Sequence, residues 1–147
     1  MGLEILGFIF SIIAGAAMSI QGVMNTRLSE KIGLYESNAY VQGTAFLISL
    51  IAMWTVGKGN ITEITQVNQL YLFGGVLGLI KTVTVMQGVG KLSPTVAIST
   101  ILIAQLLVAA IIDSLGLMGS EKIPFTWNKY VGLALLLGGV LLFKWKV

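Results

Sequence analysis

The sequence predicts an all-α integral membrane protein with five transmembrane helices per protomer, and two observations carry this prediction. Of the 147 residues, 56% are hydrophobic and only 10% are charged, whereas soluble domains carry about 25% charged residues. The apolar residues also gather in five runs separated by short polar stretches. About 20 helical residues cross the ~30 Å hydrocarbon core of a bilayer. We therefore expect one transmembrane domain over residues 1–147.

The limits of each span follow from local signals. Glu4 and a long apolar run indicate that the N-terminal segment is a first span rather than a signal peptide. Ser93 followed by Pro94 is a typical helix start, and Pro124 excludes a continuous helix through the last loop. The predicted spans are residues 2–28, 33–56, 70–89, 94–118 and 127–143.

The composition excludes several kinds of chemistry. The chain has no cysteine and no histidine, which rules out disulfides, thiol nucleophiles, Cys/His zinc sites and imidazole catalysis. It also lacks a nucleophile–base pair and a phosphate loop. We therefore expect no enzyme, no catalytic residue, no cofactor and no metal. Its basic residues are scattered near helix ends, so no nucleic-acid partner is expected either.

The basic residues of the loops give only a weak topology signal. The side of the N-terminus carries Lys58, Lys122 and Lys129, and the other side carries Arg27, Lys31, Lys91, Lys144 and Lys146. The positive-inside tendency places the C-terminus in the cytoplasm, but weakly. Two interpretations stay open. The chain has one orientation with a modest signal, or it inserts both ways and assembles as an antiparallel pair.

Lys81 is the least expected residue, because it lies in the middle of the predicted third span. A lysine at mid-depth costs at least ~2.5–3.5 kcal/mol on insertion scales, so it needs a partner or a purpose. Gly74, Gly78 and Gly88 share helical spacing with it. Small residues let helices approach closely. We therefore expect Lys81 to point into the bundle rather than at lipid.

Long polar side chains from four spans fall in one layer. Depth can be counted at about 1.5 Å per residue from the side where the first two spans meet. On this count the layer lies about 10–15 Å deep, and its members are Gln21, Gln42, Lys81 and Gln105. Asn25 and Asn38 lie one helical turn below Gln21 and Gln42. We expect these six residues to bind the substrate.

No carboxylate lies at the depth of Lys81. Glu36 is close to one surface, and Asp113 lies about 27 Å deep on the same count, near the other surface. These two are the candidate coupling or gating residues. Three environments stay open for Lys81: a cage of glutamines and carbonyls, a neutral amine, or an anionic ligand.

Two stretches resemble a known family. One runs from Ala14 through Gln21-Gly22-Val23-Met24-Asn25-Thr26-Arg27-Leu28 to Gly33, and the other from Ala104-Gln105-Leu106 through Ile112-Asp113 to Gly119. Together with five short spans, they resemble the YdcZ-like family of small bacterial inner-membrane proteins. That family belongs to the drug/metabolite transporter superfamily.

The resemblance implies a five-helix half-unit in the bacterial inner membrane. Such units pair antiparallel, as dual-topology homodimers, opposite-facing gene pairs or fused halves, and the resemblance favours the antiparallel homodimer here. Gln21, Asn25, Gln105 and Asp113 match the family's polar pattern. Lys81 departs from it, since an aromatic or aliphatic residue is usual there.

The function that these observations predict is secondary transport. We expect export of a small polar solute, anionic or zwitterionic, by alternating access between two inverted protomers. A passive channel with Lys81 in an anion-selective constriction is one alternative, and a structural or regulatory membrane subunit is another. The expected partners are a small-molecule substrate, the lipid bilayer and a second copy of the chain.

Overall fold

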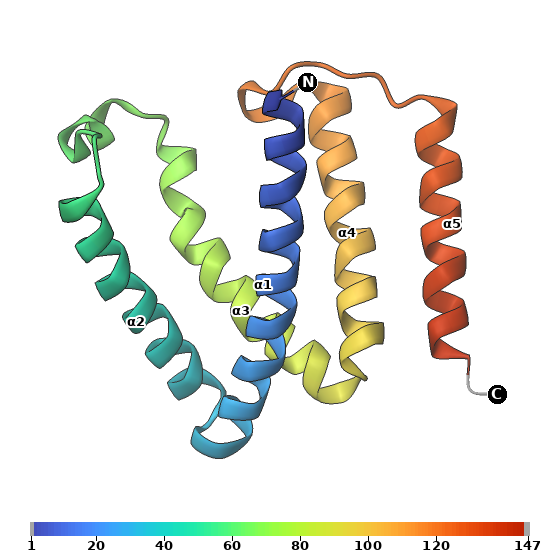
Figure 1. Ribbon diagram of the computed structural model, residues 1–147, viewed down its shortest axis with the longest axis horizontal. Coiled ribbons are helices and arrows are strands. Elements are labelled where there is room, and N and C mark those ends of the chain that lie inside the picture. The colour runs from blue at the N-terminus through green and yellow to red at the C-terminus, as the bar shows by residue number, and fades with distance from the viewer. Residues whose placement is uncertain (1, 146–147) are drawn as a thin grey trace. The chain divides into compact units, whose positions relative to one another are not determined.

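The computed structural model describes residues 2–145, and within them the chain is helical and has no strand (Figure 1). This confirms the predicted all-α class. The α-helices are α1 (Gly2–Ile32), α2 (Leu34–Thr55), α3 (Gly74–Lys91), α4 (Pro94–Leu115) and α5 (Trp127–Lys144). Short 3₁₀ helices are η1 (Ile61–Gln66), η2 (Gln69–Phe73) and η3 (Leu117–Gly119).

Local capping explains where several helices begin and end. The Ser93 hydroxyl accepts a hydrogen bond from the Val96 N–H at 3.4 Å, which confirms the helix start at Ser93 and Pro94. Gly116 caps α4 in the left-handed conformation, with φ 64°, so the helix ends at Leu115, three residues before the predicted end of the fourth span. Gly33 separates α1 from α2 with φ 100° and ψ 157°, a conformation that favours glycine.

The predicted third span agrees in extent with the helical segment Gln69–Lys91, but its first residues are not α-helical. The predicted third span begins at residue 70, but residues 69–73 form η2 and α3 begins only at Gly74. The Asn68 side chain accepts a hydrogen bond from the Leu70 N–H at 3.0 Å and so caps η2. Hydropathy alone does not distinguish a 3₁₀ turn from an α-helix, because both can be apolar.

Within residues 2–145, three helical segments are long and apolar enough to cross a membrane: Glu4–Ile32, Gln69–Lys91 and Pro94–Leu115. α2 and α5 are not among them. Polar residues near their starts include Glu36 and Asn38 in α2, and Asn128 and Lys129 in α5. That these two helices also span the membrane stays a prediction.

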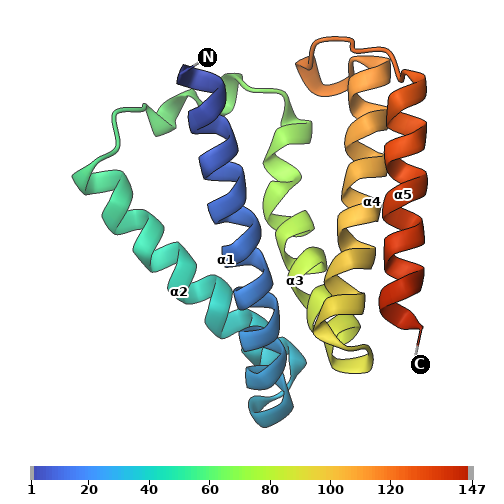
Figure 2. The ribbon, with the colours of Figure 1, turned by 45° about the vertical axis from the view of Figure 1, so that its right-hand side comes forward.

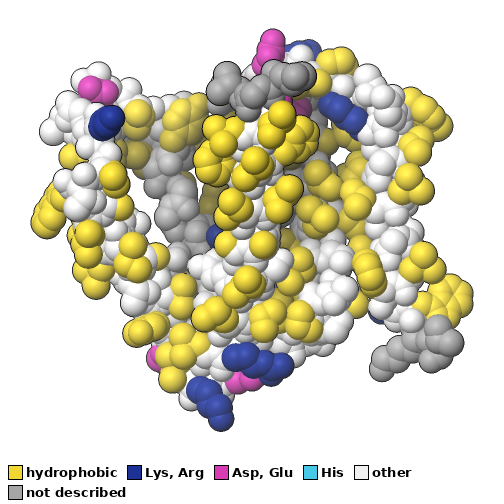
Figure 3. Space-filling model, in the orientation of Figure 1, with side chains coloured by type: hydrophobic (Ala, Val, Ile, Leu, Met, Phe, Trp, Pro, Cys, Tyr) yellow, Lys and Arg dark blue, Asp and Glu magenta, His cyan; other side chains and the backbone are white. Residues whose placement is uncertain are grey.

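The outer faces of the helices carry large apolar side chains, as expected for contact with lipid. Phe8 is 72% exposed and Ile12 is 71% exposed on α1. Figure 3 shows hydrophobic side chains along α1, and charged side chains where α1 leads into α2. Buried apolar residues are few by comparison, and in α3 they are Met86 and Val89.

The chain divides into two compact units, Met1–Gly90 and Lys91–Val147. In the first unit α1 and α2 run antiparallel, meet at Gly33 and diverge away from it (Figures 1 and 2). α3 packs against the end of this pair nearest Gly33. In the second unit α4 and α5 run antiparallel side by side. Each unit therefore presents its own candidate site.

Candidate functional site

Buried polar side chains gather where α1, α2 and α3 meet. Two buried apolar side chains of α3 lie among them. We call the whole set the three-helix junction, and its members are Asn25, Thr26, Ser37, Asn38, Thr82, Met86 and Val89. Ser37 has no exposed surface, and Met86 is only 2% exposed. The first unit is thus held together by a small core that is polar as well as apolar.

The hydroxyl groups of the junction donate to backbone carbonyls. Thr26 donates to the Gly22 carbonyl at 2.8 Å, and its oxygen also lies 3.5 Å from the Met86 carbonyl. Ser37 donates to the Asn25 carbonyl at 3.3 Å and touches the Met86 sulfur at 3.6 Å. These contacts join all three helices. They satisfy hydroxyls that would otherwise be costly to bury.

Glycines let the three helices approach each other here. A Cβ added to Gly22 of α1 would lie 3.2 Å from Cγ1 of Val85 on α3. A Cβ added to Gly78 of α3 would lie 3.4 Å from Nε2 of Gln42 on α2. Larger residues at either position would push the helices apart, in keeping with the role of small residues at helix contacts in membranes.

Lys81 lies between these two contact points on α3. It is three residues from Gly78 and four from Val85, or about 4.5 Å and 6 Å along the helix axis. Its side chain is exposed, and among the described residues its ammonium forms no hydrogen bond and no ion pair. The lysine thus lies at the edge of the junction, at the level where α2 and α1 contact α3.

The face of α3 that carries Lys81 is only partly packed within the first unit. We expected Lys81 to point into the bundle rather than at lipid, on one face with Gly74, Gly78 and Gly88, and this stays a prediction. Of these glycines only Gly78 meets a neighbour, since a Cβ added to Gly74 or Gly88 would touch nothing within 4 Å. The most buried residues of α3, Thr82 and Met86, lie on the neighbouring face, so Lys81 lies at the edge of the packed surface.

The other residues predicted in the first unit fall into two groups. Gln42 is half-buried with its amide against Gly78, and Gln21 is exposed beside Gly22, so both lie near the level of Lys81. Asn25 and Asn38 are buried deeper in the junction. The Asn38 Oδ1 atom is buried and has no hydrogen-bond partner.

Glu36 lies at the sharp turn between α1 and α2. It is exposed in the first turn of α2, and its Oε2 atom occupies the space that a Cβ on Gly33 would need. A carboxylate at a helix N-terminus is favoured by the helix dipole. This position accounts for Glu36 through local structure, and its predicted coupling or gating role stays a prediction.

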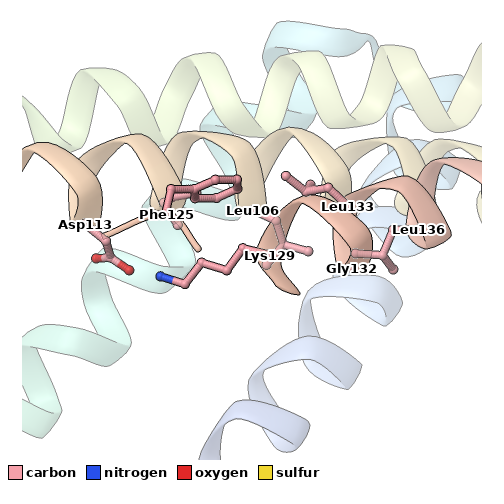
Figure 4. A pocket seen from close by; sticks show the side chains of 9 residues that line it. Leu106, Asp113, Phe125, Lys129, Gly132, Leu133 and Leu136 are labelled. Carbon is pink, nitrogen blue, oxygen red and sulfur yellow. The ribbon is translucent and has the colours of Figure 1, made fainter. Parts of the chain in front are cut away.

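The second unit contains a groove of about 310 Å³ between α4 and α5 (Figure 4). Its lining residues are Leu106, Ala109, Ala110, Asp113, Phe125, Lys129, Gly132, Leu133 and Leu136, and we call it the α4–α5 groove. Gln105 is exposed on α4 and is not part of this lining. Asp113 is half-buried at one end of the groove.

A family model with the description "Putative inner membrane exporter, YdcZ" matches residues 6–142. The chain belongs to this family. No curated protein and no solved structure matches it. The two stretches that carry the resemblance, one on α1 and one reaching from α4 to η3, lie within the matched residues.

Membership of the YdcZ family supports a coarse function, which is export across the inner membrane. Exporters are not a class of enzymes, and this agrees with the absence of nucleophile–base motifs from the sequence. Within residues 2–145, no three acidic side chains lie close enough together to hold a metal ion.

Sequence reasoning missed Lys129 and Phe125 as neighbours of Asp113. The Ile123 N–H donates to the Asp113 carbonyl at 2.9 Å, which folds the loop back onto the end of α4. Phe125 and the first turn of α5 are thereby brought beside Asp113. The sequence shows that Lys129 lies just after the start of a helix. That it comes near Asp113 depends on the path of the loop between α4 and α5.

Proposed function

We propose that this YdcZ-family protein is a secondary transporter that exports a small anionic or zwitterionic solute, which Lys81 binds. The observation that carries the proposal is the exposed Lys81 ammonium, which has no partner among the described residues and lies near the level of the Gln42 amide. A mid-membrane lysine without a counter-charge costs at least ~2.5–3.5 kcal/mol. A bound carboxylate or phosphate would offset that cost.

The glutamines supply the neutral part of the proposed site. An amide both donates and accepts hydrogen bonds, so Gln42 and Gln21 can hold the polar atoms of a solute beside the ammonium. Asn25 and Asn38, which are buried in the three-helix junction, would support this layer from below. Gln105, which is exposed on α4, stays a predicted substrate-binding residue.

The proposed assembly is an antiparallel homodimer of two five-span protomers. Two inverted copies would enclose a chamber lined by Lys81 from each copy and open it alternately to either side of the membrane. Asp113 and Glu36 are the proposed coupling or gating residues. The family membership and the small charge difference between the two sides support this arrangement.

Flux through proteoliposomes tests this function. Vesicles containing the wild type, Lys81→Met or Lys91→Met would be offered labelled carboxylates, amino acids and phosphate. We expect saturable uptake of at least one probe, accelerated by the same unlabelled probe inside. A charge-assisted hydrogen bond contributes ~1.5–3 kcal/mol, so uptake of that probe by Lys81→Met vesicles should be lower by about tenfold or more. Lys91→Met should not, since Lys91 is exposed at the end of α3.

Two results would contradict the proposal. Uptake that rises linearly and ignores internal solute would indicate a passive anion channel, in which the exposed Lys81 lines the pore. Saturable exchange that survives Lys81→Met would remove the lysine from the binding site. Reporter fusions at the C-terminus test the dimer separately. We expect signal from both compartments, and signal from one compartment would exclude dual insertion.

A further inference from the structure

The α4–α5 groove combines an apolar floor with two opposite charges at one end. Ala109, Ala110 and Gly132 leave the space open, and the floor continues to Leu106 and Leu136. From Asp113 to Leu106 the groove follows α4 for about 10 Å, roughly a third of the hydrocarbon core. The substrate-binding residues proposed around Lys81 are not in this groove, although Asp113 is also a proposed coupling or gating residue.

The two charges face each other without forming an ion pair. Figure 4 shows the Lys129 ammonium pointing toward the Asp113 carboxylate, with Leu133 and Leu136 farther along the groove. Among the described residues the lysine instead donates to the Pro124 carbonyl at 3.3 Å. It also lies 5.8 Å from the centre of the Phe125 ring. Each charge therefore keeps hydrogen-bonding capacity for a ligand.

The charged end of the groove lies where a lipid headgroup would be. Asp113 is in the last turn of α4, a segment long and apolar enough to span the membrane. Trp127 and Tyr130 on the first turn of α5 are exposed. Phe125 lines the groove with Asp113, and its ring meets that of Tyr130 edge to face, with 4.5 Å between the ring centres. Aromatic rings of this kind prefer the membrane interface.

We propose that the α4–α5 groove binds one phospholipid with a zwitterionic headgroup that carries a protonated amine, as phosphatidylethanolamine does. Lys129 binds the phosphate, Asp113 accepts hydrogen bonds from the ammonium, and the upper part of one acyl chain lies along the floor. The charge complementarity selects this occupant. An anionic headgroup without an amine leaves Asp113 repelled, and a quaternary ammonium has no N–H to donate.

Native mass spectrometry of delipidated protein tests the proposal. The protein would be mixed with equal amounts of phosphatidylethanolamine, phosphatidylglycerol and phosphatidylcholine, and the retained lipid counted per protomer. We expect one phosphatidylethanolamine per protomer, at least about tenfold over the other two, which corresponds to about 1.4 kcal/mol. Asp113→Asn should abolish this preference, and Lys129→Gln should reduce retention of all three lipids.

A filled groove provides the second arm of the test. Gly132→Leu should expel the lipid, because the new side chain occupies the floor. Gly138→Leu is the matched control, since both glycines have open space around them and Gly138 does not line the groove. Circular dichroism and gel filtration would show that each variant is folded. Asp113→Asn keeps the size of its side chain and tests the headgroup contact if Gly132→Leu does not fold.

Several outcomes would overturn the proposal. Equal retention of the three lipids, or unchanged selectivity in Asp113→Asn, would exclude headgroup recognition by the two charges. Lipid retention in Gly132→Leu as in the wild type would place the lipid elsewhere. If Gly132→Leu changes the proportion of dimer and leaves lipid retention unchanged, a second copy of the chain covers the groove instead.

Discussion

At the three-helix junction, the hydroxyls of Thr26 and Ser37 donate to backbone carbonyls and glycine contacts leave almost no free space. In the α4–α5 groove, Asp113 and Lys129 face an open volume of about 310 Å³. Polar groups therefore do different work in the two regions. In the junction the hydroxyls are already hydrogen-bonded to carbonyls, whereas in the groove the two charged groups stay available for a ligand.

Lys81 belongs to neither region, because it lies beside the junction and yet keeps its charge available. It lies beside the junction but is not packed into it, and its charge is as available as those of the groove. A residue that contributed only to packing would resemble Thr82, which is buried and donates to the Gly78 carbonyl at 2.9 Å. The comparison thus assigns stability to the junction and binding to exposed charges.

The largest difference in stability between the two regions is expected when one glycine in each is replaced by leucine. Gly22→Leu should destabilise the protein by up to about 3 kcal/mol, because the new side chain would overlap Val85 on α3. Gly132→Leu should change stability by less than about 0.5 kcal/mol, since its surroundings are open. Thermal unfolding in detergent, followed by tryptophan fluorescence, measures both.

Gly15→Leu is the control for Gly22→Leu, because Gly15 lies on the same helix with open space around it. Equal melting temperatures for the Gly22 and Gly132 variants would show that the junction is not the packed region.

A smaller loss is expected at the turn that brings α1 and α2 together. Gly33→Ala should cost about 2 kcal/mol, because φ 100° is unfavourable for a residue with a Cβ and the Glu36 carboxylate occupies the space. Gly43→Ala in α2 should be neutral or slightly stabilising, since alanine favours helix and the space is open. The same unfolding assay compares them, and a harmless Gly33→Ala would contradict the observed turn.

Substitution of Asn38 is expected to change the stability least, and the direction of that change is informative. Its buried Oδ1 has no donor, so Asn38→Leu should leave stability unchanged or raise it by up to about 1 kcal/mol. Thr26→Val should lower stability by about 0.5–1.5 kcal/mol, because that hydroxyl is bonded to the Gly22 carbonyl. A clear loss in Asn38→Leu would mean that a water or solute donates to this oxygen, and the junction would then be a binding site.

Much of the fold could be predicted because the deciding signals are local. Ser93 and Pro94 fix the start of α4 through a side-chain cap and a preset φ, whatever the rest of the chain does. Depth along a helix follows from a constant rise, so the sequence predicts Gln42 and Lys81 near one level, and Gln42 lies against Gly78, one turn from Lys81. The extent of the third span was predicted, but not that residues 69–73 form a 3₁₀ helix, because an apolar run fits either kind of helix.

The direction of Lys81 and the α4–α5 groove depend on contacts between elements. Glycines occur on two sides of α3, and only packing against α1 and α2 decides that Gly78 is inside and Gly88 is not. The groove requires the loop bond from Ile123 to Asp113, which places Phe125 beside α4. Neither contact has a local sequence signal.

The most direct test of the central claim, that Lys81 binds the exported solute, is a thermal-shift screen of the purified protein against metabolites. We expect an anionic or zwitterionic compound to raise the melting temperature of the wild type. The same compound should shift Lys81→Arg less and should not shift Lys81→Met. An equal shift in Lys81→Met, or stabilisation by cations alone, would contradict the claim.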